Sequence, residues 1–156
     1  MTQTWVTTAS PNVEAMVNSL TAACDSGFVP EAIHVLSLSD IEADVEEAIT
    51  YAERIVTAYG GDELTVHRTP IDDETEFGTI RDHVQSAIEG TEEADEIAVD
   101  ITPGRKFMSA IAFAAGMRYG ADRVYYLYIS STDYFGRLYP EIPRTAIQLY
   151  DRTEGY

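Results

Sequence analysis

Two adjacent cations, Arg105 and Lys106, are the residues best suited to chemistry in this chain of 156 residues. Lys106 is the only lysine in the sequence. The pair follows an apolar stretch that ends at Ile101, and it stands at the start of a helical pattern from about Arg105 to Tyr119. Cations at the start of a helix oppose its macrodipole, whose positive end is already there. The unpaired backbone N–H groups at that position also attract anions such as phosphates. We therefore expect this turn to hold an anionic ligand.

The neighbours of this pair supply the other groups that a phosphate site needs. Gly104 lets the backbone approach an anion closely, and the hydroxyls of Thr102 and Ser109 stand on either side of the two cations. Arg105 is suited to hold a phosphate through two hydrogen bonds, whereas Lys106 acts as a point charge. The alternative is that both cations pair with acidic side chains, of which the chain has 27.

A second polar turn follows the first apolar stretch of the chain. It contains Thr8, Ser10 and Asn12, which precede a helical pattern that begins at Val13. Ser10 or Asn12 is expected to cap that helix, because serine and asparagine are favoured at this position. A ligand role, in which Ser10 faces a phosphate with Thr8 and Asn12 beside it, stays open next to the capping role.

Common cofactor and metal motifs are absent from the sequence. It has neither the spaced glycines of an ATPase phosphate loop nor a G-x-G-x-x-G segment after the first strand. The histidines lack the spacing of a zinc site: His34 is expected in the sheet, and His67 and His83 at exposed or half-buried positions. Asp72 and Asp73 suit a turn or a helix cap better than a magnesium site. We therefore expect no metal and no cofactor.

The charge of the chain is strongly negative and unevenly distributed. The net charge is −17, but residues 1–100 carry 22 acids and three cations, whereas residues 101–156 carry five acids and seven cations. Acid excess with a single lysine is typical of proteins from high-salt cytoplasm. At 1 M salt the screening length is about 3 Å, so repulsion between acidic side chains reaches little further than that. We therefore expect a halophilic protein that binds neither duplex nucleic acid nor anionic membranes.

No segment of the sequence indicates export or a membrane span. The N-terminus lacks a basic region followed by an apolar run, and the apolar stretch at 107–117 is too short to cross a bilayer. Cys24 is the single cysteine, so it has no disulfide partner within the chain. These features predict a cytoplasmic protein.

Alternating strands and helices are expected to position the two polar turns. Strands are predicted at 5–9, 32–38, 64–68, 96–101 and 123–129, with a weaker pattern at 145–150; between them lie four helical patterns, the second capped by Asp40 and ended by Gly60 and Gly61. Such alternation predicts one α/β domain over 1–156, with a Rossmann-like, doubly wound, mostly parallel sheet of five or six strands in a three-layer sandwich. Ligands bind at the carboxyl ends of such strands, so the turns after the first and fourth strands are expected to form the site.

The segment 99–110, VDITPGRKFMSA, resembles the signature of the CRISPR-associated Rossmann fold (CARF) domains. In that family the fourth strand runs into a turn of the form T-G-G-T-K-x-M-S, which this chain matches at Thr102, Gly104, Lys106, Met108 and Ser109. Two residues depart from the pattern: Pro103 removes a backbone donor, and Arg105 is bulkier than the usual threonine. The hydroxyl-rich turn after the first strand is also similar to that of the family.

The resemblance implies a homodimer that binds a cyclic oligoadenylate across its two-fold axis in type III CRISPR defence. It also implies a stand-alone member similar to the metal-independent ring nucleases. In that role Lys106 would stabilise charge on the phosphorus and Ser10 would position the ribose or phosphate, while the ribose 2′-OH attacks. The implied ligand-binding residues are Thr8, Asn12, Thr102, Gly104, Arg105, Ser109 and Arg137. Arg137 belongs to an aromatic loop, which also contains Tyr134 and Phe135. This loop either closes over the ligand or packs on the surface.

Two other readings of the sequence stay open. One is a non-catalytic nucleotide-sensing module of the same fold that acts through a partner. The other is an unrelated phosphate- or nucleotide-binding protein with a Rossmann-like fold. Binding without turnover would indicate the first, and a preference for ATP over cyclic oligomers would indicate the second.

Overall fold

Strands and helices alternate along the computed structural model, which describes residues 2–154. The strands are β1 (Gln3–Thr7), β2 (Ala32–Leu38), β3 (Thr65–Ile71), β4 (Glu96–Asp100), β5 (Arg123–Ile129) and β6 (Ile147–Asp151). The α-helices are α1 (Val13–Asp25), α2 (Glu42–Ala58), α3 (Phe77–Glu89) and α4 (Lys106–Tyr119). The alternation that the apolar patterns predicted is confirmed.

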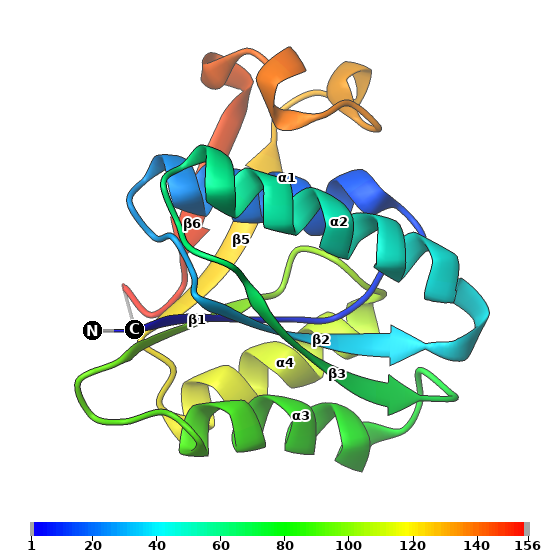
Figure 1. The fold of residues 1–156 in the computed structure, drawn as a ribbon. Helices are drawn as coiled ribbons and strands as arrows, with labels where there is room; N and C mark the ends of the chain where they lie inside the picture. The colour runs from blue at the N-terminus through cyan, green and yellow to red at the C-terminus, as the bar shows by residue number, and fades with distance from the viewer. Residues whose placement is uncertain (1, 155–156) are drawn as a thin grey trace.

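All six strands join one sheet, in the order β3-β2-β1-β4-β5-β6. The first five are parallel to one another, and β6 runs antiparallel to β5. Helices α1 and α2 cover one face of the sheet, and α3 and α4 cover the other (Figure 1). The predicted Rossmann-like sandwich of three layers is therefore confirmed, and the weak pattern at 145–150 corresponds to an edge strand.

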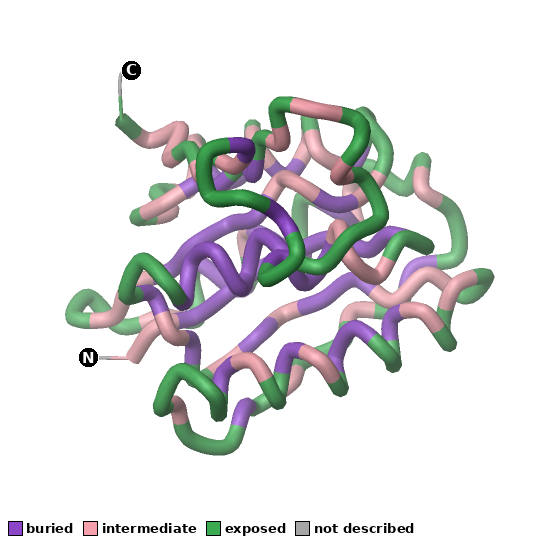
Figure 2. Tube along the Cα trace, turned by 90° about the horizontal axis from the view of Figure 1, so that it is seen from above, coloured by how far each residue is buried: buried purple, intermediate pink, exposed green. Residues whose placement is uncertain are grey.

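The middle of the sheet is buried on both faces. Trp5 and Val6, which are consecutive in β1, are fully buried in separate clusters on opposite faces. The Trp5 ring lies 6.1 Å from that of Phe28 and 5.9 Å from that of Tyr125, measured between centroids. Buried residues continue along the central strands and the inner sides of the helices (Figure 2). Helices on both faces explain why the central strands are continuous apolar runs.

Several strand limits differ from the prediction by one to three residues. β1 ends at Thr7 rather than at residue 9, and β3 continues through Pro70 to Ile71. Pro70 pairs in register with Ser37 on β2. A proline is tolerated there because β3 is an edge strand whose other side has no ladder to complete.

Two predicted helix caps are wrong in detail. Asp40 lies inside a short 3₁₀ helix, Ser39–Ile41, so Ile41 rather than Asp40 precedes α2. Asn12 does precede α1, but its side chain makes no capping hydrogen bond. The N–H group of Asn12 instead donates to Ser10 Oγ at 3.1 Å. This bond closes the polar turn after β1 before the helix begins.

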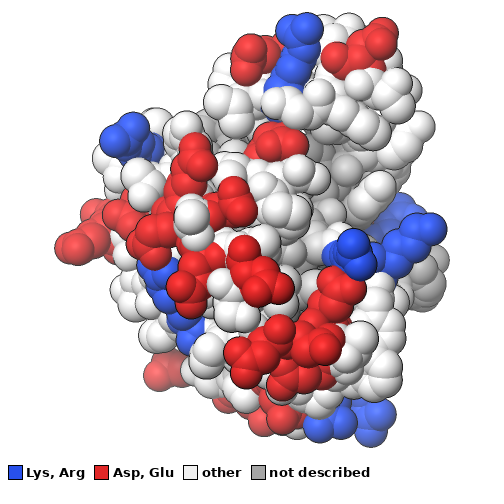
Figure 3. All heavy atoms as spheres, turned by 90° about the vertical axis from the view of Figure 1, so that its right-hand side faces the viewer, with Lys and Arg blue, Asp and Glu red and all other residues white. Residues whose placement is uncertain are grey.

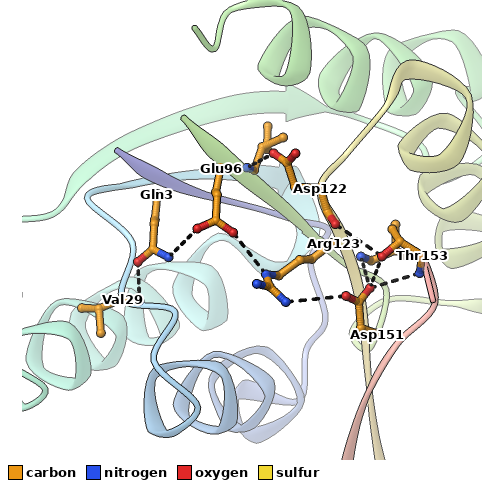
Figure 4. A network of polar contacts seen from close by, with 9 residues as sticks. Gln3, Val29, Glu96, Asp122, Arg123, Asp151 and Thr153 are labelled. Atoms are coloured by element: carbon orange, nitrogen blue, oxygen red, sulfur yellow. Dashed lines mark hydrogen bonds and ion pairs between the residues drawn. The ribbon is translucent and has the colours of Figure 1, made fainter. Parts of the chain in front are cut away.

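A polar network fastens β6 at the end of the sheet where the parallel strands begin. The Arg123 guanidinium lies 3.4 Å from Glu96 Oε2 and 3.7 Å from Asp151 Oδ2 (Figure 4). Asp151 Oδ1 accepts hydrogen bonds from the backbone N–H of Val124 and from Thr153. These contacts connect β4, β5 and β6, and they leave the opposite end of the sheet to the two polar turns.

The three histidines occupy two different environments. His34 and His67 are register partners on β2 and β3, and their rings stack with centroids 4.5 Å apart. His83, which the sequence placed at an exposed or half-buried position, is instead buried beneath the sheet. Its Nε2 donates to the carbonyl oxygen of Thr7 at 2.9 Å, and its Nδ1 lies 2.9 Å from Thr69 Oγ1. Burial lowers the pKa of His83 to about 4, so the buried ring is neutral.

Candidate functional site

The two polar turns meet at the point where the strand order changes direction. The chain leaves β1 toward β2 on one side and leaves β4 toward β5 on the other, although β1 and β4 are neighbours. Thr7 and Asp100, which end these two strands, are register partners. Open α/β sheets bind ligands outside the carboxyl ends of their strands at such a switch point.

The turn between β4 and α4 is held against the turn after β1. Gly104 has a φ of +89°, which side-chain-bearing residues rarely adopt, and a Cβ there would lie 2.7 Å from Thr8 Oγ1. Thr8 Oγ1 donates to the carbonyl oxygen of Pro103 at 2.8 Å. Glycine is therefore required at 104 for both its backbone angle and its close contact.

Three of the predicted ligand contacts have partners inside the protein. Thr8 is buried and bonds to Pro103, as described above. Ser109 Oγ donates to the same carbonyl at 3.2 Å, and Thr102 Oγ1 accepts from the N–H of Leu127 at 3.0 Å. These hydroxyls build the turn from within, so their contact with a ligand stays a prediction.

A buried carboxylate that sequence reasoning did not single out lies directly behind the turn. Asp100 is completely buried and accepts hydrogen bonds from Ser19 Oγ at 2.6 Å and from the Thr102 N–H at 3.0 Å. Desolvation raises its pKa to about 6, against the opposing effect of these hydrogen bonds. The signal in the sequence is one acid at the end of an otherwise apolar strand core, Ile97–Val99.

The two cations at the start of α4 differ in their partners. Arg105 precedes the helix in an extended conformation, and its Nη1 lies 3.0 Å from Glu74 Oε1 although its side chain is 78% exposed. Lys106 is exposed and forms no ion pair with any residue from 2 to 154. The alternative in which acids neutralise both cations thus holds for Arg105 alone.

An acidic hollow of about 600 Å³ lies on one side of the β4–α4 turn. Its walls include Ser10, Gly104 and Arg105, together with the acids Asp40, Asp72, Asp73 and Glu74. Acidic side chains gather in the middle of this face of the molecule, with cations toward its edges (Figure 3). The backbone N–H groups of Asp72 and Asp73 donate to Glu76, which confirms the predicted turn there. Because carboxylates repel phosphates, the hollow itself disfavours a polyanion.

A second hollow of about 370 Å³, the aromatic hollow, lies on the other side of the turn. Asn12 lines both hollows, and the remaining walls combine apolar and aromatic groups with few charges: Glu14, Ala15, Asn18, Thr102, Tyr126, Leu127, Tyr128, Ile129, Phe135 and Gly136. Phe135 is 63% exposed. Flat aromatic walls beside a cationic turn are suited to a nucleobase whose phosphate reaches the turn.

The loop that carries Phe135 is anchored to α1. Asn18 is buried and donates through Nδ2 to the carbonyl oxygen of Arg137 at 2.8 Å, while its Oδ1 accepts from the N–H of Tyr139 at 2.9 Å. The Tyr139 side chain is itself buried, and the Arg137 side chain is exposed. The loop is therefore a fixed wall of the aromatic hollow at its base, with Phe135 projecting from it.

The described residues contain no group of three or more histidine, cysteine or acidic side chains placed to hold a metal ion. Within the same residues, no helix has an apolar stretch of the length that a bilayer requires.

Sequence comparison with curated proteins gives no match. The family model described as CRISPR-associated protein NE0113 matches residues 25–155, which include the β4–α4 turn and the aromatic loop but not Ser10. The chain therefore belongs to the CRISPR-associated NE0113 family.

Proposed function

We propose that this protein binds a cyclic oligoadenylate as part of CRISPR defence, with the phosphates of the ring at the β4–α4 turn. Membership of a CRISPR-associated family supports the biological setting. The observation that carries the proposal is Lys106, an exposed and unpaired cation at the first turn of a helix, at the switch point of the sheet. A polyanionic ligand relieves the repulsion between this cation and the helix dipole.

The distribution of charge suggests how the ligand lies. Four acids disfavour phosphates inside the acidic hollow, whereas Arg105 lines it and Lys106 follows directly at the start of α4. The phosphates therefore sit over Arg105 and Lys106, and an adenine enters the aromatic hollow beside Phe135. Stacking of a base on an aromatic side chain contributes about 1–3 kcal/mol. Asn12, between the two hollows, is placed to donate a hydrogen bond to the ligand.

A symmetric ring calls for a symmetric protein, and the outer face of α4 supplies a surface for dimer formation. Phe107, Ala110 and Ala114 are exposed along this helix. A groove of about 400 Å³ between α3 and α4 continues this apolar surface. Phe77 and Phe107 line the groove, and their ring centroids are 4.1 Å apart. Two copies that pair through α4 would bring two β4–α4 turns around one two-fold axis.

Cleavage of the bound ring is the activity that Lys106 and Ser10 would support. The ribose 2′-oxygen attacks the adjacent phosphorus, the bond to the 5′-oxygen breaks, and the 2′ proton passes through water to the departing 5′-oxygen. The products are a 2′,3′-cyclic phosphate and a 5′-hydroxyl. Lys106 would stabilise the charge on the phosphoryl oxygens. No histidine lines either hollow among the described residues, so catalysis would depend on alignment and charge rather than on a strong base.

The test is binding and turnover in molar KCl without metal, using cyclic tri-, tetra- and hexa-adenylate and ATP. Calorimetry measures affinity, and chromatography detects products. We expect one ring to bind, and Lys106→Ala to weaken binding about tenfold or more, in line with the loss of a charge-assisted contact. Arg54→Ala, which removes an exposed cation from α2 on the opposite face of the sheet, is the matched control and should leave affinity unchanged.

Each result has a definite meaning. Loss of the ring with 2′,3′-cyclic phosphate products, abolished in Lys106→Ala, identifies a ring nuclease. Tight binding without products identifies a sensor that acts through a partner. Unaltered affinity in Lys106→Ala removes the phosphate site from this turn, and preference for ATP over every ring refutes the cyclic ligand.

A further inference from the structure

The buried carboxylate of Asp100 joins three elements at the switch point. Asp100 ends β4 and is the only acidic residue among 2–154 that is buried. Its Oδ2 accepts hydrogen bonds from Ser19 of α1 at 2.6 Å and from Thr7 of β1 at 3.4 Å. Its Oδ1 accepts from the backbone N–H of Thr102, the second residue of the β4–α4 turn, at 3.0 Å.

Stability of the fold does not account for a carboxylate in this place. Burying a charged group is unfavourable unless it is paired or fully hydrogen-bonded. Among residues 2–154 no cation forms an ion pair with it: its hydrogen bonds come from the hydroxyls of Ser19 and Thr7 and from Thr102. Apolar residues of similar size are commonly as stabilising or more so at buried charged positions. What the carboxylate does supply is a fixed acceptor for one amide of the turn.

The contacts that begin at Asp100 continue through the whole turn. Thr102, whose amide Asp100 holds, is fixed on its other side because its Oγ1 accepts from Leu127 of β5. The next carbonyl, that of Pro103, receives the hydroxyls of Thr8 and Ser109. Gly104 with its positive φ follows, and α4 begins two residues later at Lys106.

We propose that Asp100 is a positioning residue that holds the β4–α4 turn in the conformation that binds the ligand. This inference rests on the proposed function of the turn. Without the carboxylate, the turn would populate other conformations, and apparent affinity falls in proportion to the fraction that is competent to bind. Asp100 itself is buried behind the turn and does not touch the ligand.

The test compares Asp100→Asn and Asp100→Ala with a core variant on the opposite face of the sheet, Val84→Ala. Affinity for the cyclic oligoadenylate that binds the wild type is measured at a temperature where every variant is folded. Asp100→Asn keeps one acceptor for Thr102, and we expect about tenfold weaker binding. Asp100→Ala removes both acceptors, and we expect about a hundredfold, since hydrogen bonds to charged groups are worth about 1.5–3 kcal/mol.

A second measurement separates positioning from stability and from the ligand assignment. Hydrogen–deuterium exchange in the segment 100–108 should accelerate in Asp100→Ala but not in Val84→Ala, while the exchange of α2 stays unchanged in both. Equal loss of affinity in Asp100→Ala and Val84→Ala at matched stability overturns the proposal, as does wild-type affinity in Asp100→Ala. If the wild type binds no ring, the proposed function fails, and the exchange of segment 100–108 decides whether Asp100 holds the turn.

Discussion

At the scale of single residues, the site depends on which polar groups have partners inside the protein. Thr8 and Ser109 direct their hydroxyls to the Pro103 carbonyl of the turn, and the Thr102 hydroxyl bonds to β5. Arg105 contacts Glu74. An exposed ion pair of this kind is worth about 0–1 kcal/mol, so a phosphate can displace Glu74 at little cost. Lys106 has no such competitor among residues 2–154. The sequence predicted these residues as one group of ligand contacts, because spacing reveals proximity but not the direction of a side chain.

His83 gives a residue-level prediction for the dependence of stability on pH. Its folded-state pKa of about 4 lies below the ordinary value of 6.5, as does that of His34. Between these values the unfolded chain binds more protons, so the free energy of unfolding should fall as pH is lowered from 6.5 to 4. Asp100 acts in the opposite direction, because its raised pKa of about 6 makes the folded state the stronger proton binder from pH 6 down to 3.8.

Urea denaturation between pH 4.5 and 7 measures these effects. His83→Gln should make the decline toward acid pH shallower than in the wild type, and Asp100→Asn should make it steeper. A slope unchanged in His83→Gln would show that the pKa of His83 is the same in the folded and unfolded states, and it would contradict the prediction. The burial itself was readable from spacing: His83 lies three residues after Ile80 and four before Ala87, on the apolar side of α3.

At the scale of elements, the sequence determined order and layers better than limits and caps. Continuous apolar runs made the central strands recognisable, because helices cover both faces of the sheet. The limits of β3 and the start of α2 were missed for local reasons: Pro70 is accepted on an edge strand, and a 3₁₀ turn precedes α2. The apolar residues of α4 extend around the helix, so the sequence predicted the helix itself but not which of its faces stays exposed.

That exposed face gives an element-level prediction. Ala114→Arg should weaken the proposed dimer, because a long cation would have to be buried against its symmetry mate in the partner copy. Ala58→Arg, at the exposed end of α2 on the other side of the sheet, is the matched control. Sedimentation equilibrium in molar KCl measures the association constant. A monomeric wild type, or equal association in Ala114→Arg, would remove α4 from the interface.

At the scale of the whole molecule, the net charge of −17 opposes the compact state unless salt screens it. We propose that the protein is adapted to high salt, and we expect its melting temperature to rise by several degrees between 0.1 and 1 M KCl. At 1 M the screening length is about 3 Å, so the gain should level off there. A gain that continues evenly to 3 M would instead indicate that salt strengthens the burial of apolar surface.

A variant with fewer acids distinguishes the two explanations. Glu92 and Glu93 are exposed beyond α3, and neither side chain forms an ion pair within the part of the chain that the structure describes. The double substitution Glu92→Lys, Glu93→Lys removes two negative charges and adds two positive ones, which changes the net charge from −17 to about −13 without altering a buried contact. If self-repulsion sets the salt dependence, this variant should melt higher than the wild type at 0.1 M KCl and gain less from added salt. Parallel curves for the two proteins would show that repulsion from these two acids does not set the salt dependence, and would favour the strengthened burial of apolar surface instead.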